Sequence, residues 1–223
     1  MADCDRFTQL VIANHGGVDF LINNAGRSIR RAIESSYDRF HDIERTMQLN
    51  YFGALRITMG LLPGMVAKKK GHVVNLSSIS VLVNAPRFSA YVASKAALDA
   101  WTRCAASEFA DQGITFTTVN MPLVRTPMTA PTKIYDNMPL LDPEEAADMI
   151  VQACVDKPVR VATRLGIFGA LLHTAVPRVT QIVMNTTFRM FPDSAAAKGE
   201  KGAKQSLSPE AIAMAQMMRG IHF

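Results

Sequence analysis

The feature that most constrains the fold is an alternation of helical patterns with short apolar runs. The helical stretches are residues 3–15, 36–69, 89–110 and 142–155, and the apolar runs are residues 18–26, 72–78, 114–122 and 159–163. Such an alternation predicts a parallel sheet with helices on both of its faces. The runs are mainly apolar and do not alternate cleanly between apolar and polar residues, which is typical of strands that are covered on both sides.

The pattern ends near Phe191, so we expect one domain over residues 1–191. Residues 192–206 are rich in Ala, Gly, Lys and Ser, which is typical of a solvated linker. Ser208 and Pro209 then match the N-cap and first turn of a short helix. Residues 192–223 are therefore interpreted as a linker followed by a short C-terminal helix.

Composition excludes several classes of protein. The net charge is +5, but no basic stripe with interleaved aromatic residues indicates nucleic-acid binding. The sequence contains no run of 18 apolar residues, so it predicts no transmembrane helix. The three cysteines (Cys4, Cys104 and Cys154) are scattered and lie near no histidine, so we expect no metal site and a cytoplasmic location in which thiols stay reduced.

A tyrosine and a lysine stand one helical turn apart in "YVASK", as Tyr91 and Lys95. Ser78 ends the run 72–78, and ligands of parallel α/β sheets bind at the carboxyl ends of strands. We therefore expect the three side chains to converge. A nearby ammonium favours the phenolate and lowers the tyrosine pKa from about 10. The set predicts proton transfer to a carbonyl oxygen that Ser78 holds by a hydrogen bond.

Together with further motifs, these residues make the sequence resemble the short-chain dehydrogenase/reductase family. The motifs are "NNAG" at 23–26, Asn50 in "QLNYFGAL", Ser78 in "VVNLSSIS", and Tyr91 with Lys95 in "YVASKAAL". The resemblance covers roughly residues 3–163. It implies a Rossmann-like, doubly wound parallel sheet and a nicotinamide cofactor.

The resemblance also implies roles for single residues. Tyr91 would be the proton donor, and Lys95 would bind the nicotinamide ribose and lower the Tyr91 pKa. Asn50 would hold a water of the proton relay, although without the family a role in the core or at a helix bend would be the favoured interpretation. The stretch "NMPLVRT" at 120–126 is an altered form of a family signature whose Val and Thr contact the carboxamide. The implied catalytic residues are Asn50, Ser78, Tyr91 and Lys95, and the implied cofactor-binding residues are Asn24, Ala25, Gly26, Tyr91, Lys95, Val124 and Thr126.

Two longer segments are similar to bacterial fatty acyl-CoA reductases. They are "MPLVRTPMTAPTKIY" at 121–135 and "FPDSAAAKGE" at 191–200. The similarity implies an acyl-CoA or fatty aldehyde substrate and NADPH as the cofactor, with NAD left open. Family membership further implies a homo-oligomer that forms through the helices 36–69 and 89–110.

A glycine-rich phosphate cradle does not follow the first strand, where the turn reads "NNAGRS". We therefore expect an N-terminally truncated sheet that lacks the first three strands of the family, with the strand 18–26 at its edge. The stretch "RLGIFGAL" at 164–171 is interpreted as a plain loop. Residues 177–191 fit either a helix that packs against the sheet or an amphipathic helix that forms a lid or touches a membrane.

Three functional interpretations follow from these observations. The first is an NAD(P)(H)-dependent oxidoreductase. The second is a non-catalytic truncated fragment, or interaction module, whose exposed sheet edge pairs with a partner. The third is a hydrolase with Ser78 as its nucleophile, which the absence of a G-x-S-x-G motif disfavours.

Overall fold

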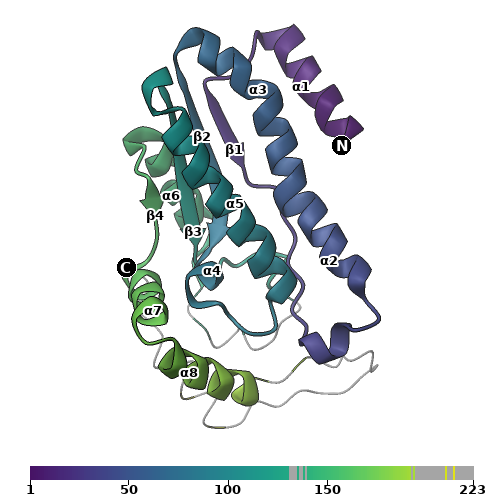
Figure 1. Ribbon diagram of the computed structural model, residues 1–223, viewed down its shortest axis with the longest axis vertical. Coiled ribbons are helices and arrows are strands. Elements are labelled where there is room, and N and C mark those ends of the chain that lie inside the picture. The colour runs from purple at the N-terminus through teal and green to yellow at the C-terminus, as the bar shows by residue number, and fades with distance from the viewer. Residues whose placement is uncertain are drawn as a thin grey trace.

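The described residues of this computed structural model form a four-stranded parallel sheet flanked by helices (Figure 1). The structure describes residues 1–130, 135, 138, 140–191, 193, 209 and 213. The strands follow one another in the order of the sequence, so each connection crosses over the sheet. This confirms the predicted parallel α/β fold. The strands are β1 (Phe20–Asn23), β2 (Gly71–Ser78), β3 (Ile114–Met121) and β4 (Arg160–Val161).

Helices cover both faces of the sheet, as the apolar strands predicted. The helices α3 (Ala54–Lys68) and α5 (Ser89–Glu108) lie on one face, and α6 (Pro143–Asp156) lies on the other (Figure 1). Successive side chains of a strand point to opposite faces. Val73 accordingly joins the core beneath α3 and α5, whereas its neighbour Val74 joins the core beneath α6.

The expected helix over 36–69 is wrong in its continuity. A 3-10 turn η1 (Ile33–Ser36) precedes α2 (Phe40–Met47), and a π-helical turn η2 (Gln48–Gly53) separates α2 from α3. A π-turn carries one extra residue and often occurs at functional sites. Here it contains Asn50, whose side chain is fully buried. The preceding α1 (Ala2–His15) agrees with the predicted first helix and lies along α3.

The expected loop over 164–171 is also wrong, because these residues begin the helix α7 (Arg164–Ala175). The Thr163 hydroxyl accepts a hydrogen bond from the Gly166 backbone N–H and so caps the helix. Gly166 and Gly169 lie against the short helix α4 (Ile79–Val83), where a Cβ atom at either position would come within 3.0 Å of an α4 side chain. The glycines thus allow close helix packing rather than a loop.

The helix α6 begins where the sequence predicted, whereas the position of the later helix α8 (Pro177–Met190) differs from the prediction. Asp142 precedes α6, and the Glu145 carboxylate accepts a hydrogen bond from the Asp142 backbone N–H. After α7, the helix α8 has no buried residue and contacts α7, so the expectation that 177–191 packs against the sheet is wrong. A 3-10 turn η3 (Ala110–Gln112) connects α5 to β3.

The first and last strands are shorter than the predicted runs 18–26 and 159–163. β1 pairs only with β2 and lies at an edge of the described sheet, with Phe20 and Ile22 exposed. In the described part of the chain, no helix has the length and apolar character needed to cross a bilayer. The predicted linker and C-terminal helix at 192–223 fall outside the described residues, apart from positions 193, 209 and 213.

Candidate active site

Ser78 and Tyr91 meet where β2 ends. Ser78 is the last residue of β2 and the N-cap of α4, and its Oγ accepts hydrogen bonds from the Ser80 backbone N–H at 3.2 Å and the Ser80 hydroxyl at 2.9 Å. The first turn of α5 brings Tyr91 to the same place, where its phenol is hydrogen-bonded to the Ser78 side chain. The structure therefore brings together the serine and tyrosine that the sequence singled out.

The pKa of the Tyr91 phenol moves upward from its ordinary value, contrary to the expected decrease. Burial is the main cause, and the hydrogen bond from Ser78 offsets only part of it. Lys95 does not counter the burial, because its ammonium is directed at a backbone carbonyl of β2. The expectation that Lys95 lowers the Tyr91 pKa is therefore wrong for this structure.

Lys95 is one of the most deeply placed charges of the chain, with 4% of its surface exposed. Its Nζ donates a hydrogen bond of 2.6 Å to the Leu76 carbonyl oxygen, two residues before Ser78. Burial lowers its pKa from 10.5 to about 8. An ammonium has three donors, so the Leu76 bond leaves Lys95 with donors for a ligand.

Asn50 connects the loop after β1 to the helix that carries Tyr91. Its Nδ2 donates to the Arg27 carbonyl and to the Ser94 hydroxyl, both at 2.9 Å, and its Oδ1 accepts from the Arg27 backbone N–H at 2.8 Å. The Ser94 hydroxyl in turn donates to the Tyr91 carbonyl at 2.7 Å. These bonds give Asn50 a positioning role, and its part in a proton relay stays a prediction.

Gly26 leaves open the space in front of Lys95. A Cβ atom at this position would lie 3.4 Å from both the Asn50 Oδ1 and the Lys95 Nζ. A side chain longer than alanine would therefore fill the region that the lysine donors face. Asn24 and Ala25 precede it and are exposed at the end of β1. That Lys95, Tyr91 and Gly26 hold a nicotinamide ribose stays a prediction.

Val124 and Thr126 lie in the loop after β3, at the same end of the sheet as Ser78. Val124 forms an isolated bridge with Leu141, and its carbonyl accepts a hydrogen bond from the Thr129 hydroxyl at 2.9 Å. The Thr126 backbone N–H donates to the same hydroxyl at 3.1 Å. These bonds order the loop beside the site, while the expected contact with a carboxamide stays a prediction.

A network that the sequence did not reveal holds the end of β2 from the other side. Arg160 on β4 donates two hydrogen bonds to the Asp99 carboxylate, at 2.9 and 3.1 Å, and a third to Asn120. Asn120 Nδ2 donates to the Ser78 carbonyl at 3.2 Å. The only signal in the sequence is an asparagine near the end of β3, a strand that also contains three threonines, and it does not identify its partners.

Tyr135 is a second tyrosine near the site that sequence reasoning missed. It interacts electrostatically with Tyr91 and with Arg30, and burial raises its pKa to about 12. It also packs against Phe191. Tyr135 is thus an un-ionised phenol at neutral pH that interacts with Tyr91.

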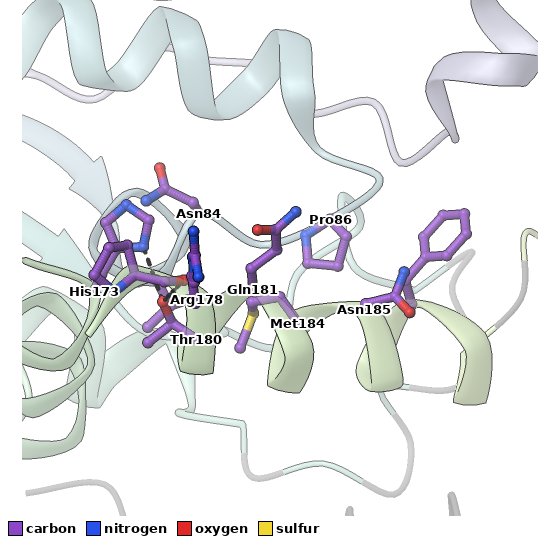
Figure 2. A pocket seen from close by; sticks show the side chains of 11 residues that line it. Asn84, Pro86, His173, Arg178, Thr180, Gln181, Met184 and Asn185 are labelled. Carbon is purple, nitrogen blue, oxygen red and sulfur yellow. Dashed lines mark hydrogen bonds between the residues drawn. The ribbon is translucent and has the colours of Figure 1, made fainter.

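A groove of about 450 Å³ lies beyond α4, apart from Ser78, Tyr91 and Lys95 (Figure 2). It separates α8 from residues 83–86, with Gln181 pointing from α8 toward Pro86. At one end the His173 ring lies 3.4 Å from the Thr180 hydroxyl. In the described part of the chain, no three His, Cys, Asp or Glu side chains are grouped so that they would hold a metal ion.

Comparisons with known proteins agree with this geometry. The sequence profile of the short chain dehydrogenase family matches residues 1–135. A fatty acyl-CoA reductase of Acinetobacter baylyi is 53% identical over 219 residues, which cover 98% of this chain and 73% of that protein. A fatty acyl-CoA reductase of Mycobacterium tuberculosis is 46% identical over 185 residues, which cover 82% of this chain and 63% of that protein.

A solved structure is similar as well. The crystal structure of a short-chain dehydrogenase from Streptomyces avermitilis is 29% identical and superposes with a TM-score of 0.68, covering 83% of this chain and 76% of that one.

Proposed function

The chain belongs to the short-chain dehydrogenase family of oxidoreductases, and from this premise we propose that it reduces a fatty acyl-CoA or fatty aldehyde with NADPH. The observation that carries the proposal is the hydrogen bond between Ser78 and Tyr91 at the end of β2, with the Lys95 ammonium on the Leu76 carbonyl of the same strand and close to Gly26. The substrate class rests on the names of the two similar reductases.

Each side chain has a defined task in this reaction. When bound, the reduced nicotinamide supplies the hydride that attacks the carbonyl carbon. The Ser78 hydroxyl donates a hydrogen bond to the carbonyl oxygen, and the Tyr91 phenol gives that oxygen its proton. With an aldehyde this yields the alcohol, whereas with an acyl-CoA it yields a thiohemiacetal whose C–S bond breaks to release CoA–SH and the aldehyde. Lys95 binds the ribose hydroxyls with the donors that Leu76 leaves unused. Asn50 holds the loop that contains Gly26 in place against α5.

The direct test is NADPH oxidation in the presence of a long-chain acyl-CoA or the corresponding aldehyde. The absorbance of NADPH measures the rate, and product analysis identifies what is formed. We expect activity in the parent protein and a loss of at least about a hundredfold in Ser78→Ala, because Ser78 contacts the reacting oxygen. Comparing the rate with NADH to the rate with NADPH decides which cofactor the protein uses. An unchanged rate in Ser78→Ala would remove this serine from the site.

We propose two further properties of the active protein. It forms a homo-oligomer through the surface of η2, α3 and α5, where Leu49, Phe52 and Met59 lie exposed at helical spacing. It also resides in the cytoplasm, a proposal that the free thiols of Cys4, Cys104 and Cys154 support.

A second candidate function rests on the edge of the sheet. Phe20 and Ile22 of β1 are exposed, and the backbone of an edge strand can pair with a further strand. The chain would then be an interaction module rather than an enzyme. Titration with NADPH separates the two candidates, because only the enzyme requires saturable cofactor binding that Lys95→Ala weakens.

A further inference from the structure

The helices α7 and α8 each have several exposed apolar side chains and contact one another. They lie at the rim of the molecule, outside the helical layers that cover the sheet (Figure 1). Leu171 on α7 is 65% exposed, and Ile182 on α8 is 67% exposed. Exposed apolar groups that are gathered in this way mark interaction surfaces. We call them the α7–α8 face, which consists of Ile167, Phe168, Leu171, Val179, Ile182 and Val183.

The packing of α7 against α4 determines which side of α7 is exposed. Gly166 and Gly169 lie against α4 and leave no room for a side chain between the two helices. The exposed residues Ile167, Phe168 and Leu171 occupy the opposite side of the helical wheel. The close contact with α4 therefore turns the large apolar residues of α7 outward.

The same division holds along α8. Gln181, Met184 and Asn185 line the groove toward residues 83–86 (Figure 2). Val179, Ile182 and Val183 follow the spacing of one helical face, on the side of α8 that faces away from this groove. No residue of α8 is buried, so this apolar side has no partner among the described residues.

The charge of the region is of one sign. No aspartate or glutamate occurs from residue 157 to residue 192, whereas Arg164 on α7 and Arg189 on α8 are exposed. Arg178 is exposed as well, but it lines the groove on the other side of α8. The helix α1 also has exposed apolar residues, but there Asp5 forms an ion pair with Arg56. Within residues 157–192 the α7–α8 face therefore combines apolar surface with arginines and no acidic residue.

We propose that the α7–α8 face binds the surface of an anionic phospholipid bilayer, with both helices lying in the interface. Apolar side chains on one side of a helix and arginines at its edge are what interfacial helices use. Pairing of this face with the same face of a second copy would bring the arginines together without acidic partners, which like-charge repulsion disfavours. A bilayer supplies both the apolar depth and the negative charge.

The test is co-sedimentation of the full chain with vesicles of phosphatidylcholine alone or mixed with phosphatidylglycerol. We expect at least about tenfold stronger binding to the anionic vesicles, since each arginine near such a surface adds to the attraction. Binding should weaken as the salt concentration rises. The double variant Leu171→Gln with Ile182→Gln should lose at least about tenfold in binding, because it removes apolar surface from both helices.

Two further variants control the experiment. Val155→Gln with Val159→Gln removes two equally exposed apolar side chains outside the face and should bind like the parent. Arg164→Gln with Arg189→Gln should abolish the preference for anionic vesicles. Circular dichroism and thermal melting establish that each variant is folded.

Three outcomes would overturn the proposal. The parent protein could fail to bind either vesicle, or the Leu171 and Ile182 variant could bind as the Val155 and Val159 control does. Light scattering could instead show a dimer that this variant alone dissociates, which would assign the face to a second copy. If the Leu171 and Ile182 variant does not fold, the salt dependence of the parent protein still tests the proposal. Binding of the parent to anionic vesicles that does not weaken with salt would contradict it.

Discussion

Replacing Lys95 with methionine should stabilise the fold while removing a charge that the proposed reaction needs. Burial lowers the Lys95 pKa from 10.5 to about 8, and only 4% of the residue is exposed. Each pKa unit corresponds to about 1.4 kcal/mol, so the buried charge costs about 3 kcal/mol at neutral pH. Methionine has a similar length and no charge, so it should remove most of this cost. The loss of the hydrogen bond to Leu76 offsets part of that gain.

The same shift makes the free energy of unfolding depend on pH in a defined window. The native pKa of Lys95, about 8, lies below the value of 10.5 for the unfolded chain. Between these values the unfolded state binds more protons, so the stability of the parent protein rises with pH. From about pH 7 to about pH 9.5 the parent should gain about 2 kcal/mol relative to Lys95→Met.

Urea denaturation of both proteins at the two pH values measures this gain. All other groups titrate in both proteins, so the change in their difference isolates Lys95. Lys68→Met, at the exposed end of α3, is the control and should leave the pH dependence as it is in the parent. A difference between parent and Lys95→Met that stays constant within about 0.5 kcal/mol would refute the reasoning.

Three other predictions concern catalysis, positioning and assembly. Tyr91→Phe should cut reductase turnover at least about a hundredfold, or about 2.7 kcal/mol of barrier, without weakening NADPH binding; activity within threefold of the parent would contradict this. Ser94→Ala should lower the free energy of unfolding by about 1–2 kcal/mol in urea, because Asn50 and the Tyr91 carbonyl both lose a partner. Ala100→Arg, on the exposed side of α5, should dissociate the oligomer in light scattering, and a parent that is already monomeric would end that proposal.

The sequence predicted what depends on local pattern. The strands were placed from apolar runs, and Asp142 with Pro143 marked the start of α6 correctly. The convergence of Ser78 and Tyr91 followed from a general rule about the carboxyl ends of parallel strands. The match of the short chain dehydrogenase profile confirms the family that these residues indicated.

The sequence failed where tertiary packing decides. Two glycines made 164–171 resemble a loop, but contact with α4 outweighs their weak helix propensity. The network of Arg160, Asp99 and Asn120 joins positions up to 61 residues apart, and no local pattern connects them. The direction of the Tyr91 pKa was mispredicted because burial can be read only from a folded structure.

That direction bears on the reaction the site favours. Burial raises the pKa of the Tyr91 phenol, so the phenol keeps its proton across the neutral range. A proton donor must begin in its protonated form, whereas the reverse reaction, alcohol oxidation, needs the phenolate as a base. The same burial leaves Lys95 still mostly charged at neutral pH, since its pKa of about 8 lies above this range. At neutral pH the site therefore holds a protonated phenol at Tyr91 and a charged lysine on the Leu76 carbonyl, which are the protonation states that the proposed carbonyl reduction uses.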